Sequence, residues 1–80
     1  DLALGAYRMQ AGDVAGAIAL WREALKVNPG MVLVRVNLAN ALWRSGNLEE
    51  ARTMAETALR FHPASAEARA LLQQMGESKP

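Results

Sequence analysis

A step of about 34 residues repeats through this chain and limits the folds that it can adopt. The step carries Pro29 onto Pro63 and Gly12 onto Gly46. It also relates several small and apolar residues: Ala17 to Ala51, Ala24 to Ala58, Leu25 to Leu59, and Leu4 to Leu38 to Leu72. A repeat of this length is one supersecondary unit, whose apolar face is buried only by stacking on a neighbour. The period therefore predicts a repeat architecture of two units that leads into a third.

Two segments, 14–27 and 48–61, have the pattern of amphipathic helices. Apolar residues recur there every three or four positions: Val14, Ala17, Ile18, Trp21, Ala24 and Leu25, then Leu48, Ala51, Ala55, Ala58 and Leu59. Each segment follows a glycine, which suits the left-handed end of a preceding helix. Asp13 and Asn47 come next and suit the N-cap of the new helix. The sequence therefore predicts two helix-turn-helix units.

The segment from Met31 to Trp43 carries mixed signals. Val32, Val34, Val36 and Leu38 alternate as they would in a half-buried strand. The segment continues into a good helix former, however, and its images one period away, at 4–10 and 66–75, look helical. We therefore expect a helix from about Gly30 to Arg44, preceded by a break at Pro29, because the residue before a proline is pushed out of the α region.

At these positions the chain resembles the tetratricopeptide repeat family. The family pattern is matched by a Leu with a small residue, by paired alanines and by a closing proline: Leu4-Gly5 and Leu38-Ala39, Ala17 with Ala24, Ala51 with Ala58, and Pro29 and Pro63. Its large aromatic is present as Trp21 and replaced by Ala55, and its early Trp is replaced by Asp1 and Arg35. The resemblance implies an all-α fold, with antiparallel helix-turn-helix repeats stacked as a short right-handed α-solenoid of about five helices.

The last part of the chain reads as a single helix. Ala68, Leu71, Leu72 and Met75 form a stripe at helical spacing, and Gly76 is expected to end it. One interpretation is a cap over the apolar end of the second repeat, and the other is that Leu71 and Met75 bind another subunit. We expect one helical domain over 1–76, with units at about 1–31 and 32–65, a capping helix at about 64–76 and a polar tail at 77–80. Because the chain begins at Asp1 rather than Met, we expect it to be a piece of something longer, with the missing part upstream.

The resemblance also implies a concave surface, lined by the first helix of each unit, where peptides or partner helices dock. The residues expected there are Ala6, Met9, Gln10, Val36, Asn37, Asn40, Trp43, Arg44, Ala70 and Gln74. Trp43 and Arg44 belong to residue types enriched at binding hot spots, and the Asn37 and Asn40 amides can bond to a peptide backbone. The alternative is that Trp43 packs between helices and the two asparagines are solvated.

One subclass of the family holds the C-terminal carboxylate of heat-shock chaperones with a clamp of Lys, Asn and Arg side chains. Asn37 matches the asparagine of the second unit. Leu2 and Ala6 replace the Lys and Asn of the first unit, and Glu67 and Leu71 replace the Lys and Arg of the third. The clamp is therefore broken, and the sequence argues against chaperone-tail capture by this mechanism.

Composition argues against several other functions. Nine basic and eight acidic residues give a formal net charge of +1. Proteins that bind nucleic acid or anionic membranes usually carry an excess of positive charge, so this balance argues against both functions. There is no cysteine, and His62 is the only histidine, so neither a metal site nor a general base is indicated. No apolar run has the ~20 residues of a membrane span. Glu49 and Glu50 read as partners of a helix dipole rather than as catalytic acids. We expect no enzyme and no cofactor, and the compartment stays undetermined.

Two functional hypotheses remain. The first is a scaffold that binds a peptide or helix of a partner protein through its concave face. The second is a structural module that packs on its own copy or on an upstream domain, because fewer than three full repeats give marginal stability. The fold alone does not choose between them.

Overall fold

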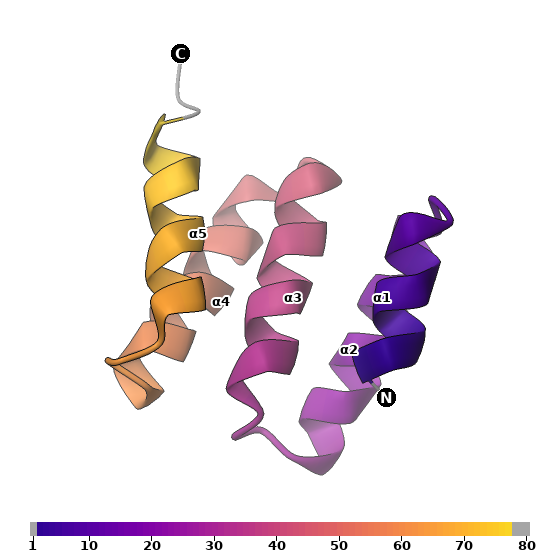
Figure 1. The fold of residues 1–80 in the computed structure, drawn as a ribbon, viewed down its shortest axis with the longest axis horizontal. Coiled ribbons are helices and arrows are strands. Elements are labelled where there is room, and N and C mark those ends of the chain that lie inside the picture. The colour runs from indigo at the N-terminus through magenta and orange to yellow at the C-terminus, as the bar shows by residue number, and fades with distance from the viewer. Residues whose placement is uncertain (1, 78–80) are drawn as a thin grey trace.

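The computed structural model describes residues 2–77, and Asp1 and the last three residues of the predicted tail lie outside that range. The described residues form five helices and no strand: α1 (Leu2–Gln10), α2 (Val14–Val27), α3 (Val32–Arg44), α4 (Leu48–Phe61) and α5 (Ala66–Glu77). In Figure 1, α1, α3 and α5 form one layer, and α2 and α4 lie behind them. The expected all-α repeat fold is confirmed. The boundaries between units stay a prediction.

Each helix packs on the next one along the chain, and α3 also contacts α5. The result measures 28 × 28 × 18 Å, with α3 in the middle of its layer. Its largest fully buried side chains, Leu38, Leu42 and Val34, all belong to this helix. The core of the molecule therefore lies around α3.

The strand-like alternation of α3 follows from this central place. Val34, Val36 and Leu38 are all 6% exposed or less, and so are Ala39, Ala41 and Leu42 farther along the helix. A helix that is apolar on most sides is buried on most sides, and here α2, α4 and α5 all contact α3. The helix begins at Val32, after an N-cap at Met31, slightly later than the predicted start at about Gly30.

The two glycine turns have the predicted backbone. Gly12 and Gly46 have φ angles of 87° and 94°, in the left-handed region that favours glycine. At the first turn the Asp13 carboxylate accepts a hydrogen bond of 2.9 Å from the Gly16 N–H, as an N-cap does. At the second turn Asn47 occupies the N-cap of α4, but its side chain makes no capping hydrogen bond.

The crossing of α1 and α2 depends on a glycine. Gly5 is buried, and a Cβ added to it would overlap Nε1 and Cε2 of the Trp21 indole. The indole is only 2% exposed, and its N–H has no hydrogen-bond partner among the described residues. The ring therefore packs directly against the backbone of α1. The other small residues of the repeat pattern are also buried, at Ala17, Ala39, Ala51 and Ala58, whereas Ala24 is only partly buried.

Helix α5 covers the end of the second unit. Ala68, Leu71 and Met75 are at most 5% exposed, and Leu72 packs partly against them. Because Leu71 and Met75 are buried within this chain, they are not free to bind another subunit, and the capping interpretation is favoured. The helix passes through Gly76 to Glu77, one residue beyond its predicted end.

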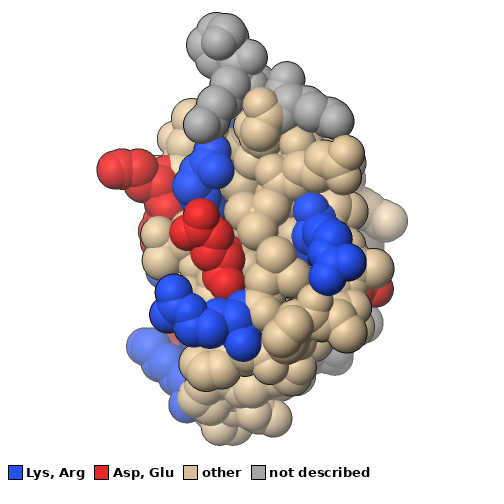
Figure 2. Space-filling model, turned by 90° about the vertical axis from the view of Figure 1, so that its left-hand side faces the viewer, with Lys and Arg blue, Asp and Glu red and all other residues tan. Residues whose placement is uncertain are grey.

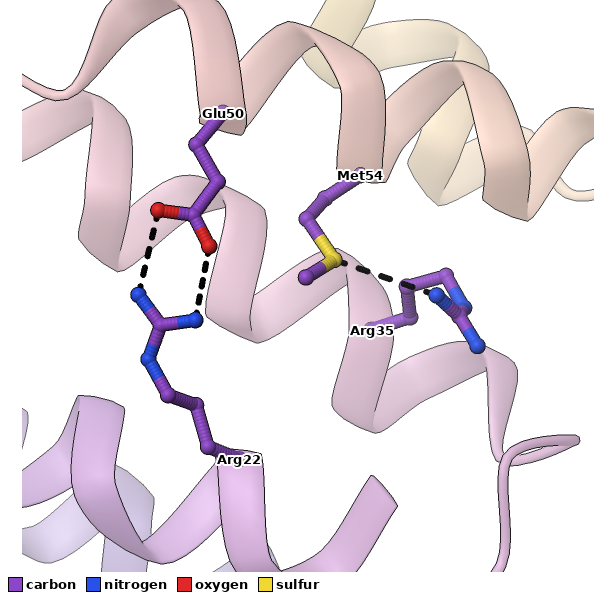
Figure 3. A network of polar contacts seen from close by, with 4 residues as sticks. All are labelled: Arg22, Arg35, Glu50 and Met54. Atoms are coloured by element: carbon purple, nitrogen blue, oxygen red, sulfur yellow. Dashed lines mark hydrogen bonds and ion pairs between the residues drawn. The ribbon is translucent and has the colours of Figure 1, made fainter. Parts of the chain in front are cut away.

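An arginine fastens each proline loop to the helix that follows it. Nη2 of Arg35 donates a hydrogen bond of 2.8 Å to the Pro29 carbonyl, and Nη2 of Arg69 donates one of 2.8 Å to the Pro63 carbonyl. The two arginines are themselves one period apart. Arg35 also reaches α4, with Nη1 at 3.8 Å from the Met54 sulfur (Figure 3). The side chain that replaces the early Trp of the family thus ties a loop to two helices.

Candidate partner-binding face

A hollow of about 330 Å³ is lined by residues of α1, α2 and α3. Helices α1 and α3 belong to the layer nearer the viewer in Figure 1. Helix α1 supplies one wall, α3 the other, and α2 behind them the floor. The lining residues of this α1–α3 hollow are Ala6, Met9, Gln10, Trp21, Asn37, Asn40 and Arg44. Its volume lies within the range of small ligand pockets, so it suits a side chain or a short peptide segment rather than a whole domain.

Helical spacing explains why these residues share the hollow. Asn37, Asn40 and Arg44 stand three and four positions apart, so α3 presents them on one face. On α1, Ala6 lies three and four positions before the other two lining residues of that helix. Trp21 reaches the hollow because Gly5 leaves room for its indole.

The polar groups of the hollow are open to an incoming partner. The Asn37 amide has no hydrogen bond among the described residues. Arg44 donates from Nε to Oδ1 of Asn40 at 3.5 Å, which is at the long limit for such a bond. The lining holds one cation and no carboxylate. The site therefore offers amide donors and acceptors, and one guanidinium whose only hydrogen bond among the described residues is this long one.

Four of the six residues predicted for partner binding come together here. They are Met9, Asn37, Asn40 and Arg44. Trp43 is partly buried against the core and does not line the hollow, in agreement with the alternative interpretation of this residue. Gln74 lies exposed on α5, away from the hollow.

Other residues of the predicted concave surface divide in the same way. Ala6 and Gln10 line the hollow, Ala70 is exposed on α5, and Val36 is buried in the core. Trp21 was missed, because its place in an apolar stripe indicated a core residue. Gly5 on the facing helix was the signal that could have identified Trp21. Because glycine has no side chain, the indole can lie against the α1 backbone and extend to the hollow between α1 and α3.

The opposite layer carries an ion pair between units. Arg22 on α2 and Glu50 on α4 form two hydrogen bonds of 2.6 and 3.1 Å (Figure 3). The guanidinium holds the pKa of the Glu50 carboxyl below its ordinary value, and the carboxylate raises the pKa of Arg22. The two side chains are 42% and 41% exposed, so the pair is a surface contact.

A second ion pair supports the first turn. Nη1 of Arg8 bonds to the Asp13 carboxylate at 2.7 Å. That bond, with the Gly16 N–H, holds the pKa of Asp13 below its ordinary value. Asp13, Arg22 and Glu50 all lie outside the α1–α3 hollow. Their ion pairs stabilise the first turn and the contact between α2 and α4.

Charges of both signs share the side formed by α4 and α5. There, acidic and basic side chains interleave along one edge, and a further basic side chain stands across the uncharged surface beside them (Figure 2). Between residues 2 and 77, no three side chains of His, Cys, Asp or Glu come together as a metal site. No helix in that range is long and apolar enough to cross a bilayer.

The family model for the tetratricopeptide repeat matches residues 8–75, most of the chain. The chain belongs to the tetratricopeptide repeat family. Comparison with curated proteins gives no match. Tetratricopeptide repeats generally mediate protein–protein interactions and are typically non-catalytic scaffold modules. The general class of function inferred from the sequence is therefore confirmed at the level of the family.

Proposed function

We propose that this tetratricopeptide-repeat segment binds a peptide or helix of a partner protein through the face formed by α1, α3 and α5. The observation that carries the proposal is the α1–α3 hollow, where Asn37, Asn40 and Arg44 stand together with open polar groups. An apolar floor with a few convergent polar groups is the usual composition of a binding site. The partner is a protein, and we propose no catalytic role for the segment, since His62 is an exposed residue at the C-cap of α4.

Site-specific photo-crosslinking tests this proposal. A photoreactive amino acid replaces Gln10, on the wall of the hollow, in one variant and Thr53, exposed on α4, in a matched control. We expect protein adducts from position 10, and we expect their yield to fall when Asn40→Ala and Arg44→Ala are added. Equal adducts from both positions, or a yield that the added substitutions leave unchanged, would contradict the proposal.

A second candidate function rests on the outer side of α1. Leu4 is 41% exposed and Tyr7 is 67% exposed, whereas Leu38 and Ala41, the equivalent residues one period later, are fully buried. Those residues are buried because α3 lies between two helical units, and α1 has described neighbours on one side only. We propose that a second copy of the chain or an upstream domain covers this side of α1.

Sedimentation over a concentration series tests whether a second copy of the chain covers this side of α1. Self-association predicts a mass that rises with concentration and a Leu4→Ser, Tyr7→Ser variant that stays monomeric. A wild-type monomer at every concentration would exclude packing on a second copy.

A further inference from the structure

We propose a second ligand site, on the layer of α2 and α4, for a small carboxylate with a short apolar tail. The site is a hollow of about 270 Å³ that shares no residue with the α1–α3 hollow. The lining of this α2–α4 hollow comes from three helices: Arg22, Leu25 and Lys26 of α2, Arg35 and Leu38 of α3, and Met54 of α4. The proposal goes beyond the proposed function, because it concerns a small molecule on a different face of the molecule.

The charge of the α2–α4 hollow favours an anion. Its lining contains three cations and no carboxylate, whereas the α1–α3 hollow has one cation. Two of the three cations have a carboxylate close by, since Arg22 pairs with Glu50 and Lys26 contacts Glu23. Even when these two carboxylates are counted, the cations outnumber the anions. A negatively charged ligand therefore fits the hollow better than a neutral or positive one.

Lys26 and Arg35 are the two cations that can hold the headgroup. The Lys26 ammonium is 3.4 Å from Glu23, and the two side chains are 73% and 70% exposed, so that contact is weak. Arg35 has no carboxylate partner among residues 2–77. Its Nη2 donates to the Pro29 carbonyl, and its Nη1 donates to the Met54 sulfur at 3.8 Å. A thioether is a weak acceptor, so a carboxylate oxygen that replaces it at Nη1 forms a stronger, charge-assisted hydrogen bond.

The contacts of the two arginines decide where the carboxylate binds. In Figure 3 the Arg22–Glu50 pair lies on one side of Met54, and Arg35 lies on the other. Arg22 already forms hydrogen bonds of 2.6 and 3.1 Å to a carboxylate, so an incoming anion gains least there. The other neighbour of the Arg35 guanidinium is the Phe61 ring, whose centre lies 6.0 Å from Cζ, at the limit of a cation–π contact. The headgroup therefore belongs beside Arg35.

The apolar tail of the ligand lies against Leu25 and Met54. Both side chains are partly buried and pack on the core, and Leu38, which also lines the hollow, is fully buried. Apolar surface that the tail covers leaves water, which favours binding. The volume is just below the range of about 300–1,000 Å³ that is typical of drug-sized ligands, so the tail is short. A ligand in this place contacts three helices and stabilises their stacking.

NMR titration with three probes of similar size tests the proposal at neutral pH. The probes are hexanoate, hexanamide and hexylammonium, whose headgroups are negative, neutral and positive. The signals to follow are the methyl groups of Leu25 and Met54 and the Arg35 Nε–H. We expect hexanoate to bind at least about tenfold more tightly than hexanamide, added salt to weaken it, and hexylammonium to leave these signals unmoved. The side-chain amides of Asn37 and Asn40, in the α1–α3 hollow, are expected to stay in place.

Three variants decide the role of the cations. Arg35→Gln is expected to bring hexanoate close to the affinity of hexanamide. Lys26→Gln is expected to weaken hexanoate about two- to fivefold and to leave hexanamide unchanged. The Lys26 side chain is exposed, so this variant keeps the test decisive if Arg35→Gln does not fold. Arg60→Gln, at an exposed arginine outside both hollows, is the matched control and is expected to bind as the wild type does.

Several results would overturn the proposal. These are equal binding of hexanoate and hexanamide, hexanoate shifts confined to Asn37 and Asn40, no shifts at millimolar concentration, or a Lys26→Gln variant that binds hexanoate as tightly as the wild type does. None of them bears on the α1–α3 hollow as a peptide site, which the photo-crosslinking experiment tests separately.

Discussion

In the first unit a glycine lies against a buried indole, whereas in the second unit the equivalent positions hold two alanines. Gly5 and Trp21 correspond to Ala39 and Ala55, and Trp21, Ala39 and Ala55 are all 2% exposed or less. Both combinations pair a first helix with a second helix at the same point of the period. The two crossings are therefore filled by different residue pairs. In the first unit a very large side chain packs against a residue that has none, and in the second unit two small side chains pack together.

Removal of the Trp21 indole is expected to destabilise the fold more than any other change considered for these two crossings. Trp21→Ala removes a buried ring and leaves a cavity between α1 and α2, so we expect a loss of about 3–5 kcal/mol of unfolding free energy. A domain of this size has little stability to spare. Urea unfolding followed by circular dichroism measures the effect.

Substitution of the facing glycine sharpens the same comparison. Gly5→Ala is expected to cost about 1–3 kcal/mol in the wild type, because the new Cβ overlaps the indole. In the Trp21→Ala background the same change is expected to be neutral or to stabilise by up to about 1 kcal/mol, through helix propensity. A penalty of equal size in both backgrounds would show that the two residues do not share one space.

A smaller contrast concerns one alanine position in the two units. Ala58 is 1% exposed and Ala24, one period earlier, is only partly buried. Ala58→Leu therefore overpacks its crossing at a cost of about 1–3 kcal/mol, and Ala24→Leu costs less. Thermal melts of the two variants rank them directly. Wild-type stability for both variants would contradict tight packing at this position of the repeat. A larger loss for Ala24→Leu than for Ala58→Leu would contradict the expected ranking.

The smallest effect belongs to the ion pair that joins the units. Arg22 and Glu50 are exposed, so a double-mutant cycle with Arg22→Gln and Glu50→Gln is expected to give a coupling of about 0.2–1 kcal/mol that falls with added salt. A coupling that salt does not change would indicate packing rather than charge.

The carboxylates of the two ion pairs, Glu50 and Asp13, make the stability of the fold depend on pH with a definite sign. The pKa values of Glu50 and Asp13 are lowered in the folded state, so each carboxylate stabilises the fold above its ordinary pKa and loses that contribution as the pH falls through the lowered value. Stability is therefore expected to decline below about pH 4, the ordinary range of these groups. Glu50→Gln is expected to make the decline shallower, whereas Glu56→Gln, at an exposed carboxylate of α4, should preserve it.

Much of the fold followed from the sequence because its determinants are local or periodic. The repeated step between prolines, the glycines at 12 and 46 and the stripe of α5 each predict a feature from the order of residues alone. Asn47 shows the limit of local reasoning. The residue type suits an N-cap, yet its side chain makes no capping bond, because that bond depends on a rotamer that the sequence does not specify.

The composition of the hollow was harder to predict, because it depends on how far each helix is rotated about its axis. One step along α3 separates Arg44, which lines the hollow, from Trp43, which packs against the core. The Arg22–Glu50 pair was missed for a similar reason. Its members are 28 residues apart, a separation that brings side chains together only through the angle between stacked units.

The bonds from Arg35 and Arg69 to the proline carbonyls have a consequence for the shape of the molecule. Each bond lies at a joint between consecutive helix pairs and joins a guanidinium to a backbone carbonyl rather than to a carboxylate. Protonation of carboxylates therefore leaves these two bonds in place. We expect the angle between units, and with it the width of the opening between α1 and α3, to persist at acidic pH after the Arg8–Asp13 and Arg22–Glu50 pairs have separated.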